Sequence, residues 1–231
     1  MVSLASILPQ GVVVFETSFD VGLDVLTELE MAYIAGAVRE RQREFSTVRW
    51  CARQAMSRLG VVYADLVPGS DRAPLWPGGV IGSMTHCNSY RAAAVARRGS
   101  ICSLGIDAEP NQLVPSDVLE MVALPEERLM FEKLNAMEDR VAWDRLVFSA
   151  KESVFKALYP IFGLWIDFLD CRIEIHLSAC RFTVEFCGSS LPLMELATER
   201  IVGRWAAGRS PDSNVSISDR SPHLFTSVMF H

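Results

Sequence analysis

The sequence predicts an α+β protein made of two similar halves in a pseudo-twofold arrangement, each with a small, mostly antiparallel sheet packed on helices. The order of the expected elements supports this prediction, because helices followed by strands occur once in the first part and again in the second. The composition agrees, since half of the 231 residues are hydrophobic and 22% are charged, which suits a folded protein with a real core. A polar stretch with two prolines at 110–115 separates the repeats, so we expect halves at 1–111 and 112–231.

The first half is expected to begin with a short strand at 12–15 and two helices. Residues 26–44 predict the first helix, although Gly36 weakens its middle. Ser46 is a suitable N-cap for the second helix, which Gly60 closes. The break between the two helices is therefore expected near Ser46.

A hairpin is expected after these helices. Residues 90–96 and 101–108 both have the composition of strands, and the four residues between them include a glycine. The two segments are therefore expected to pair with each other.

The second half repeats the order of helices and then strands. Proline and acidic residues at 115–117 and 125–127 are typical of helix starts. The longest helical pattern covers 140–158 and has an apolar stripe along one face. Alternating residues predict strands at 171–176, 181–186 and 224–230.

Charge and cysteine usage exclude several classes of protein. The net charge of −6 argues against a nucleic-acid-binding surface, which needs an excess of basic residues. The sequence contains no apolar run long enough to span a bilayer and no signal-peptide pattern near its start. The six cysteines form no CxxC pair, so we expect reduced thiols in a cytoplasmic protein that binds neither nucleic acid nor membrane.

Two carboxylates stand at the end of the strand expected at 101–108. Because residues two apart in a strand point to the same side, Gly105, Asp107 and Glu109 share one face. Like charges this close are costly unless a proton or cation lies between them, and Mg²⁺ prefers such oxygens. We therefore expect a metal-binding edge here, with Gly105 leaving room for a bulky ligand; acids that merely face solvent are the alternative.

A second polar cluster lies on the long helix expected at 140–158. Glu152 and Lys156 are four residues apart and share a face, with Lys151 beside them. Only three of the 22 basic residues are lysines, and the third is Lys133, so two of them fall in this one motif. An ordinary surface ion pair is the alternative to a phosphate-binding site.

Three blocks of sequence together resemble the phosphopantetheinyl transferases, specifically the Sfp-type enzymes of the enterobactin-synthase-component-D-like branch. The blocks are Trp76-Pro77 with Gly82–Cys87, then Gly105–Pro110, and then Phe148–Ala157. Their order and spacing also match that family.

The resemblance implies a 4′-phosphopantetheinyl transferase fold with its active site in the cleft between the two halves. It implies a monomeric, holo-[acyl-carrier-protein] synthase type enzyme that moves the 4′-phosphopantetheine arm of coenzyme A onto a serine of an apo acyl or peptidyl carrier protein. Such carriers serve fatty-acid, polyketide or nonribosomal peptide synthesis, and the second product is 3′,5′-ADP.

The resemblance also implies roles for individual residues. The expected metal ligands for Mg²⁺, with Mn²⁺ as an alternative, are Asp107, Glu109 and Glu152. The expected catalytic residues are Asp107, Glu152 and Lys156, where Glu152 is the candidate general base toward the carrier serine and Lys156 neutralises phosphate charge. The expected contacts to coenzyme A are Arg41, Arg49, Arg72, Ser83, Thr85, His86, Asp107, Lys151 and Lys156.

Two other functions use the same residues. The first is another Mg²⁺-dependent phosphate-ester or pyrophosphate hydrolase, which would cleave coenzyme A without a carrier. The second is a non-catalytic coenzyme A or carrier-binding protein, for which Asp107 would not be essential. The residues leave open which carriers are modified, which divalent metal is preferred, and whether Glu152 acts mainly as base or as ligand.

Overall fold

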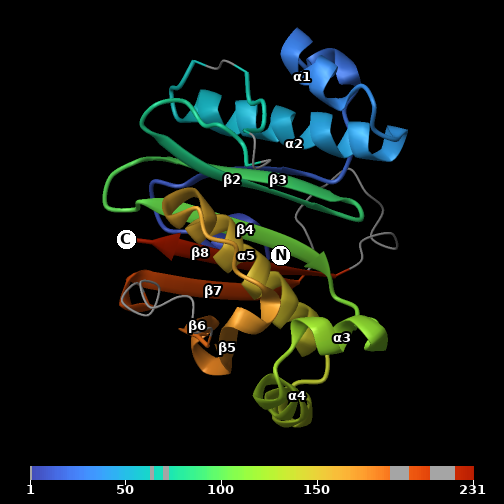
Figure 1. Cartoon of the computed structure of the whole chain (residues 1–231), viewed down its shortest axis with the longest axis vertical. Helices are drawn as coiled ribbons and strands as arrows, with labels where there is room; N and C mark the ends of the chain where they lie inside the picture. Colours follow the sequence, from blue (N-terminus) through green and yellow to red (C-terminus); the bar gives the residue numbers. More distant parts are fainter. Residues whose placement is uncertain (1, 63–64, 70–72, 188–197, 209–221) are drawn as a thin grey trace.

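The computed structural model describes residues 2–62, 65–69, 73–187, 198–208 and 222–231, and it contains two antiparallel sheets with helices packed against them (Figure 1). The first sheet has the strand order β1-β3-β2, with bounds β1 Val13–Thr17, β2 Val80–Cys87 and β3 Tyr90–Arg97. The second sheet has the order β4-β8-β7-β6-β5. Its bounds are β4 Ser103–Pro110, β5 Cys171–His176, β6 Arg181–Phe186, β7 Ile201–Gly208 and β8 His223–Phe230. The prediction of an α+β fold with two small antiparallel sheets is confirmed.

The described part of the chain contains five α-helices. They are α1 Glu28–Ile34, α2 Arg39–Arg58, α3 Ser116–Val122, α4 Pro125–Met137 and α5 Trp143–Phe162. Short 3₁₀ turns are η1 Leu4–Ile7, η2 Leu23–Val25, η3 Phe168–Asp170, η4 Leu177–Ala179 and η5 Thr198–Arg200. Figure 1 shows α2 lying along the first sheet and α5 crossing β4 and β8 of the second. No helix in the described ranges has the length and apolar character needed to cross a membrane.

The first two helices divide at a different place from the one expected. The chain leaves the helix after Ile34 and re-enters it at Arg39, so Gly36 lies in the break. Ser46 lies inside α2, where it is fully buried and its hydroxyl donates to the carbonyl of Arg43 at 3.0 Å. Ser46 is therefore an interior residue of α2 and the predicted N-cap was wrong, whereas Gly60 does follow α2 with a left-handed φ of 70°.

The expected hairpin between 90–96 and 101–108 is also wrong. β3 pairs with β2 through a tight turn at Asn88 and Ser89, and Ser89 has a left-handed φ of 57°. β4 instead pairs with β8, so that Asp107 lies opposite Thr226, more than a hundred residues away in the chain. The strand that ends the first half in sequence thus belongs to the sheet formed by the second half.

The two sheets meet edge to edge at β2 and β4. The backbone amide of Ile106 donates to the Ser83 hydroxyl at 3.1 Å, and the amide of Ala108 donates to the Thr85 hydroxyl at 3.1 Å. Side chains of β2 therefore satisfy backbone donors of β4 that would otherwise be buried without partners. This junction holds β4 in a fixed position between the first sheet and α5.

Candidate active site

Asp107 is the centre of the candidate site, and it is buried, with 4% of its surface exposed. Its Oδ1 accepts hydrogen bonds from the Thr85 hydroxyl at 3.0 Å and from the Lys156 ammonium at 2.7 Å. Its Oδ2 accepts from the Ser149 hydroxyl at 2.8 Å. Strand β2 and helix α5 thus hold this carboxylate from both sides, and its orientation is fixed before any ligand arrives.

Gly105 explains how α5 comes so close to β4. A Cβ built on Gly105 would lie 2.0 Å from the carbonyl oxygen of Ser153 and 2.7 Å from the backbone nitrogen of Ala157. The space beside Gly105 is therefore filled by the helix backbone, and the expectation that it leaves room for a ligand was wrong. The missing side chain instead lets the helix that carries Glu152 and Lys156 reach the acidic edge of β4.

Lys156 bridges the helix and the strand. Its ammonium pairs with Asp107 and also lies 3.4 Å from the carbonyl oxygen of Ile106, while 27% of its side chain remains exposed. Burial alone would lower the pKa of Lys156, but the carboxylates of Asp107, Glu152 and Glu109 together raise it above the ordinary value. Lys156 is therefore a fixed cation that is still partly accessible to a phosphate.

The two glutamates, Glu109 and Glu152, also have raised pKa values, but here burial is the cause of the rise. Burial, with the nearby charge of Asp107, raises the pKa of Glu109 to about 7, although Arg145 and Lys156 oppose this. Glu109 accepts a hydrogen bond from Arg145 at 3.2 Å. Burial also raises the pKa of Glu152, with Lys156 opposing and Asp107 adding to the rise. The acids are thus crowded in a poorly solvated place, where a further cation would stabilise their charged forms.

The donor chemistry of this cluster fits a hard divalent cation. Asp107, Glu109 and Glu152 offer carboxylate oxygens, which Mg²⁺ and Ca²⁺ prefer to nitrogen or sulfur. In the part of the chain that the structure describes, no three acidic, histidine or cysteine side chains converge into a ready metal site, and Lys156 neutralises Asp107 instead.

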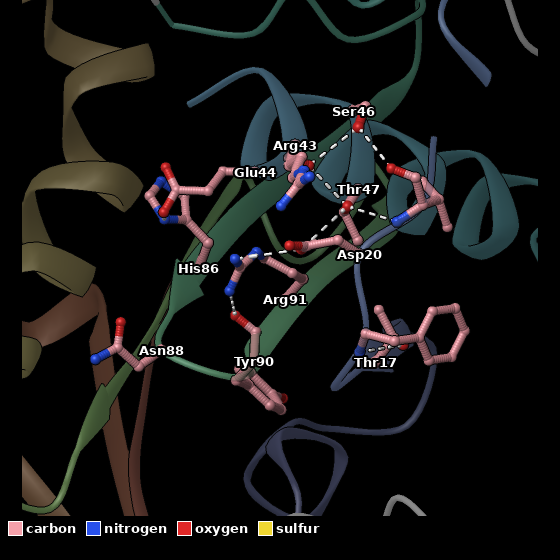
Figure 2. A network of polar contacts seen from close by, with 12 residues as sticks. Thr17, Asp20, Arg43, Glu44, Ser46, Thr47, His86, Asn88, Tyr90 and Arg91 are labelled. Atoms are coloured by element: carbon pink, nitrogen blue, oxygen red, sulfur yellow. Dashed lines mark hydrogen bonds and ion pairs between the residues drawn. The ribbon is translucent and has the colours of Figure 1, made fainter. Parts of the chain in front are cut away.

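A second polar cluster lies where α2 faces the end of β2. The Arg41 guanidinium donates to Nε2 of His86 at 2.8 Å, and the Glu44 carboxylate lies 3.2 Å from Nδ1 of the same ring. Glu44 also pairs with Arg41 at 3.3 Å. Two side chains that were expected to bind a phosphate, Arg41 and His86, are thus brought together, and Figure 2 shows the Glu44 carboxylate beside the His86 ring.

Several other residues that were expected to contact coenzyme A make their hydrogen bonds inside the protein. The hydroxyls of Ser83 and Thr85 join the two sheets, as described above. Arg49 is 4% exposed, donates to the carbonyl oxygen of Leu66 at 3.1 Å and stacks over the Phe45 ring. Arg72 lies outside the described residues.

Lys151 does not join the Asp107 cluster. All three ammonium donors are used in the interior, by Glu127 at 2.7 Å and by the carbonyl oxygens of Val122 at 3.0 Å and Phe168 at 2.7 Å. The Lys151 and Glu127 side chains are each 1% exposed. The geometry therefore gives no support to the expected phosphate contact of Lys151, because the ammonium would have to abandon a buried carboxylate to reach a ligand.

Sequence reasoning missed two residues that shape the acidic site. Ser149 donates to Asp107, and Arg145 donates to Glu109. Both precede Glu152 and Lys156 on α5 at spacings of three or four residues, which place them on one face of a helix. Extending the Glu152 and Lys156 stripe toward the start of the helix would have found them.

Comparison with known proteins agrees with this arrangement. The family model described as "4'-phosphopantetheinyl transferase N-terminal domain" matches residues 29–96, and that of the "4'-phosphopantetheinyl transferase superfamily" matches residues 103–207. The chain is 46% identical over 208 residues to 4'-phosphopantetheinyl transferase Svp of Streptomyces mobaraensis, covering 89% of this chain and 85% of the relative.

Two further relatives are similar over most of their length. 4'-Phosphopantetheinyl transferase PptT of Mycobacterium tuberculosis is 41% identical over 81% of this chain and 83% of the relative. Enterobactin synthase component D of Salmonella typhi is 33% identical over 82% of this chain and 78% of the relative. The chain therefore belongs to the 4′-phosphopantetheinyl transferase family, whose members transfer the phosphopantetheine arm of coenzyme A to carrier proteins.

Proposed function

We propose that this transferase depends on Mg²⁺, held by Asp107, Glu109 and Glu152, and that it modifies acyl or peptidyl carrier proteins of fatty-acid, polyketide or nonribosomal peptide synthesis. The observation that carries the proposal is the convergence of β4 and α5, which sets Lys156 against Asp107 at 2.7 Å beside two glutamates of raised pKa. When bound, the cation would neutralise charge on the pyrophosphate of coenzyme A and on its leaving group.

Glu152 is the proposed general base. Transfer requires the carrier serine to lose its hydroxyl proton as its oxygen attacks the β-phosphorus and 3′,5′-ADP leaves. A carboxylate is a better base when its pKa is closer to the working pH, and burial raises the pKa of Glu152. This environment supports a role in which Glu152 accepts the serine proton.

Lys156 is the proposed cation on the reacting phosphates. The Asp107 carboxylate keeps it protonated and holds it at one position, so no reorganisation is needed as charge develops on the phosphate oxygens. Ser149 and Thr85 fix Asp107 in turn.

Arg41 and His86 are proposed to bind the 3′-phosphate of the ribose. Arginine suits this role because its planar fork donates two parallel hydrogen bonds to phosphate oxygens. The Arg41 side chain is 51% exposed, which supports an accessible anion site. Arg49 and Arg72 are further candidates for contacts to coenzyme A. Ser83 and Thr85 are proposed to act by holding β4 in place.

The proposed setting is a monomer in the cytoplasm, with the active site between residues 1–111 and 112–231. All six cysteines are free thiols, which agrees with a reducing compartment.

The experiment is to incubate the protein with coenzyme A, Mg²⁺ and a panel of apo carrier proteins, and to weigh the products by mass spectrometry. A carrier is expected to gain one phosphopantetheine in the presence of Mg²⁺ but not of a chelator. Asp107→Asn is expected to lower kcat/KM by about a hundredfold or more, because it removes charge from the reacting centre.

Asp117→Asn is the matched control, since Asp117 is an exposed aspartate on the nearby helix α3. A hydrolase that uses the same acids would instead break coenzyme A without any carrier. A pure binding protein would leave every carrier unmodified, and either result would refute the proposal.

A further inference from the structure

Glu44 contacts both of the side chains proposed to bind the 3′-phosphate, Arg41 and His86. Its Oε1 lies 3.2 Å from Nδ1 of His86, and its Oε2 lies 3.3 Å from the Arg41 guanidinium. The Glu44 side chain is 19% exposed and that of His86 is 33% exposed, so the pair is partly shielded from water. Solvent therefore screens the contact of Glu44 with His86 less than it screens an ordinary surface ion pair.

The contacts of the His86 ring show which of its two nitrogen atoms carries the proton. A guanidinium can only donate hydrogen bonds, so Nε2 of His86 accepts from Arg41 at 2.8 Å and carries no proton. The remaining ring proton is therefore on Nδ1, which lies 3.2 Å from the Glu44 carboxylate. In this state His86 is neutral, and its second nitrogen has a lone pair rather than a donor to offer.

A phosphate changes what the Nε2 atom must do. Phosphate oxygens accept hydrogen bonds, so His86 can contribute only after Nε2 gains a proton and the Arg41 guanidinium turns to the phosphate. The ring then becomes an imidazolium whose Nδ1–H still points at Glu44. A carboxylate on one nitrogen stabilises a proton on the other, as in pairs of histidine with an acidic partner.

We propose that Glu44 is a positioning residue for the 3′-phosphate of coenzyme A: it holds the Nδ1–H of His86, so that the ring takes up one proton from solvent at Nε2 when the phosphate binds. This inference rests on the proposed assignment of Arg41 and His86 to that phosphate. It makes binding of coenzyme A proton-coupled, whereas binding of 3′-dephospho-coenzyme A is not.

The surrounding charges show why the carboxylate is needed. His86 faces Arg41 and Glu44 from α2, Arg91 from the paired strand β3 and Lys156 from α5. Burial lowers the pKa of His86, and the three cations lower it further, whereas Glu44 raises it. Among these groups Glu44 supplies the opposing charge, so without it an imidazolium would meet cations from three elements.

The test compares wild type with Glu44→Gln, which keeps a hydrogen-bond acceptor for Nδ1 but removes its charge. Glu40→Gln is the matched control, because Glu40 is exposed on the same helix. KM and kcat are measured for coenzyme A and for 3′-dephospho-coenzyme A at about pH 6 and about pH 8. At the higher pH, Glu44→Gln is expected to raise KM for coenzyme A about fivefold to tenfold, since one pKa unit is a factor of ten.

The difference in KM is expected to shrink at the lower pH, where protonation of His86 costs less free energy, and to be absent from kcat and from the kinetics with 3′-dephospho-coenzyme A. Calorimetric titration of the enzyme with coenzyme A in two buffers of different ionisation enthalpy should show proton uptake that is smaller in Glu44→Gln. The inference would be overturned if Glu44→Gln raised KM equally for coenzyme A and 3′-dephospho-coenzyme A. It would also be overturned if the pH profile of Glu44→Gln matched that of wild type.

His86→Ala separates this inference from the assignment beneath it. If His86→Ala keeps the preference for coenzyme A over 3′-dephospho-coenzyme A, then the phosphate assignment fails and the role of Glu44 fails with it. If His86→Ala loses that preference while Glu44→Gln behaves like Glu40→Gln, then only the role of Glu44 is refuted.

Discussion

The hydroxyl of Thr85 on β2 donates to Oδ1 of Asp107 on β4 at 3.0 Å, across the junction between two sheets. The same hydroxyl accepts from the backbone amide of Ala108 at 3.1 Å. One side chain therefore fixes both the position of the strand and the orientation of its central carboxylate. Any change that separates the two sheets also changes the site.

Replacing Thr85 tests this link. Thr85→Val keeps the shape but leaves the buried amide of Ala108 without its acceptor, which is expected to cost about 1–3 kcal/mol of unfolding free energy. Activity is expected to fall as well, because Asp107 loses a donor. Thr85→Ser retains the hydroxyl and is the control; urea unfolding and transfer kinetics of both variants decide the matter. Equal behaviour of the two variants would show that the hydroxyl is not what joins the sheets.

The acidic site was largely predictable, because the relevant signals are local. Side chains two residues apart point to the same face of a strand, which is the spacing of Asp107 and Glu109. Side chains four residues apart lie on the same face of a helix, which is the spacing of Glu152 and Lys156. The structure brings together Lys156 and Asp107, two residues that the resemblance had assigned to one catalytic set without predicting their contact.

The pairing of strands was not predictable in the same way. β4 has the composition of a hairpin partner for β3, but its backbone donors go to β8 and to two hydroxyls of β2. β7 was missed because its sequence, Ile201–Gly208, has no clear alternation and contains small residues. The buried contact of Lys151 with Glu127 was not predictable either, because Glu127 comes from another helix and no local spacing reveals such a contact.

The raised pKa of Glu109 predicts a pH-dependent stability. Burial and the charge of Asp107 place this pKa at about 7, above the 4.5 of an ordinary glutamate. Between these values the folded state keeps a proton that the unfolded state has lost, so stability falls as the pH rises through this range. Glu109→Gln removes the titrating group and is expected to stabilise the metal-free protein by about 1–3 kcal/mol at about pH 8, with little effect near pH 4.

Urea unfolding in the presence of a chelator measures this difference, and Glu132→Gln, an exposed change on α4, is the control. Adding Mg²⁺ should stabilise wild type more than Glu109→Gln, because the metal favours the ionised carboxylate. A Glu109→Gln variant that is less stable than wild type at the higher pH would contradict the raised pKa.

Gly105 predicts a strict limit on side-chain size. Gly105→Ala would place a Cβ 2.0 Å from the Ser153 carbonyl oxygen, so α5 must move away from β4. The expected cost is about 3 kcal/mol or more of unfolding free energy, at the upper end for an overpacked core. Gly99→Ala is the control, because a Cβ at Gly99 meets no atom within 4 Å. Thermal unfolding compares the two variants, and equal melting temperatures would mean that the helix can shift without cost.

The buried pair of Lys151 and Glu127 gives a prediction that also separates two roles for the lysine. Glu127 accepts from the amides of Leu124 at 2.8 Å and Ile173 at 2.7 Å as well as from Lys151, so Lys151→Met leaves a buried carboxylate without its cation. The expected loss is about 3–5 kcal/mol, and the double variant Lys151→Met with Glu127→Gln should be more stable than Lys151→Met alone, because no unpaired charge remains.

Lys133→Met provides the matched control, since Lys133 is exposed on α4. Urea unfolding of the single and double variants gives the coupling free energy, and transfer kinetics on the same proteins give KM for coenzyme A. A phosphate contact by Lys151 would have the reverse signature, with a higher KM and little change in stability. Because every ammonium donor of Lys151 is taken in the interior, we expect the loss to appear in stability, and in activity only through the displacement of the neighbouring Glu152.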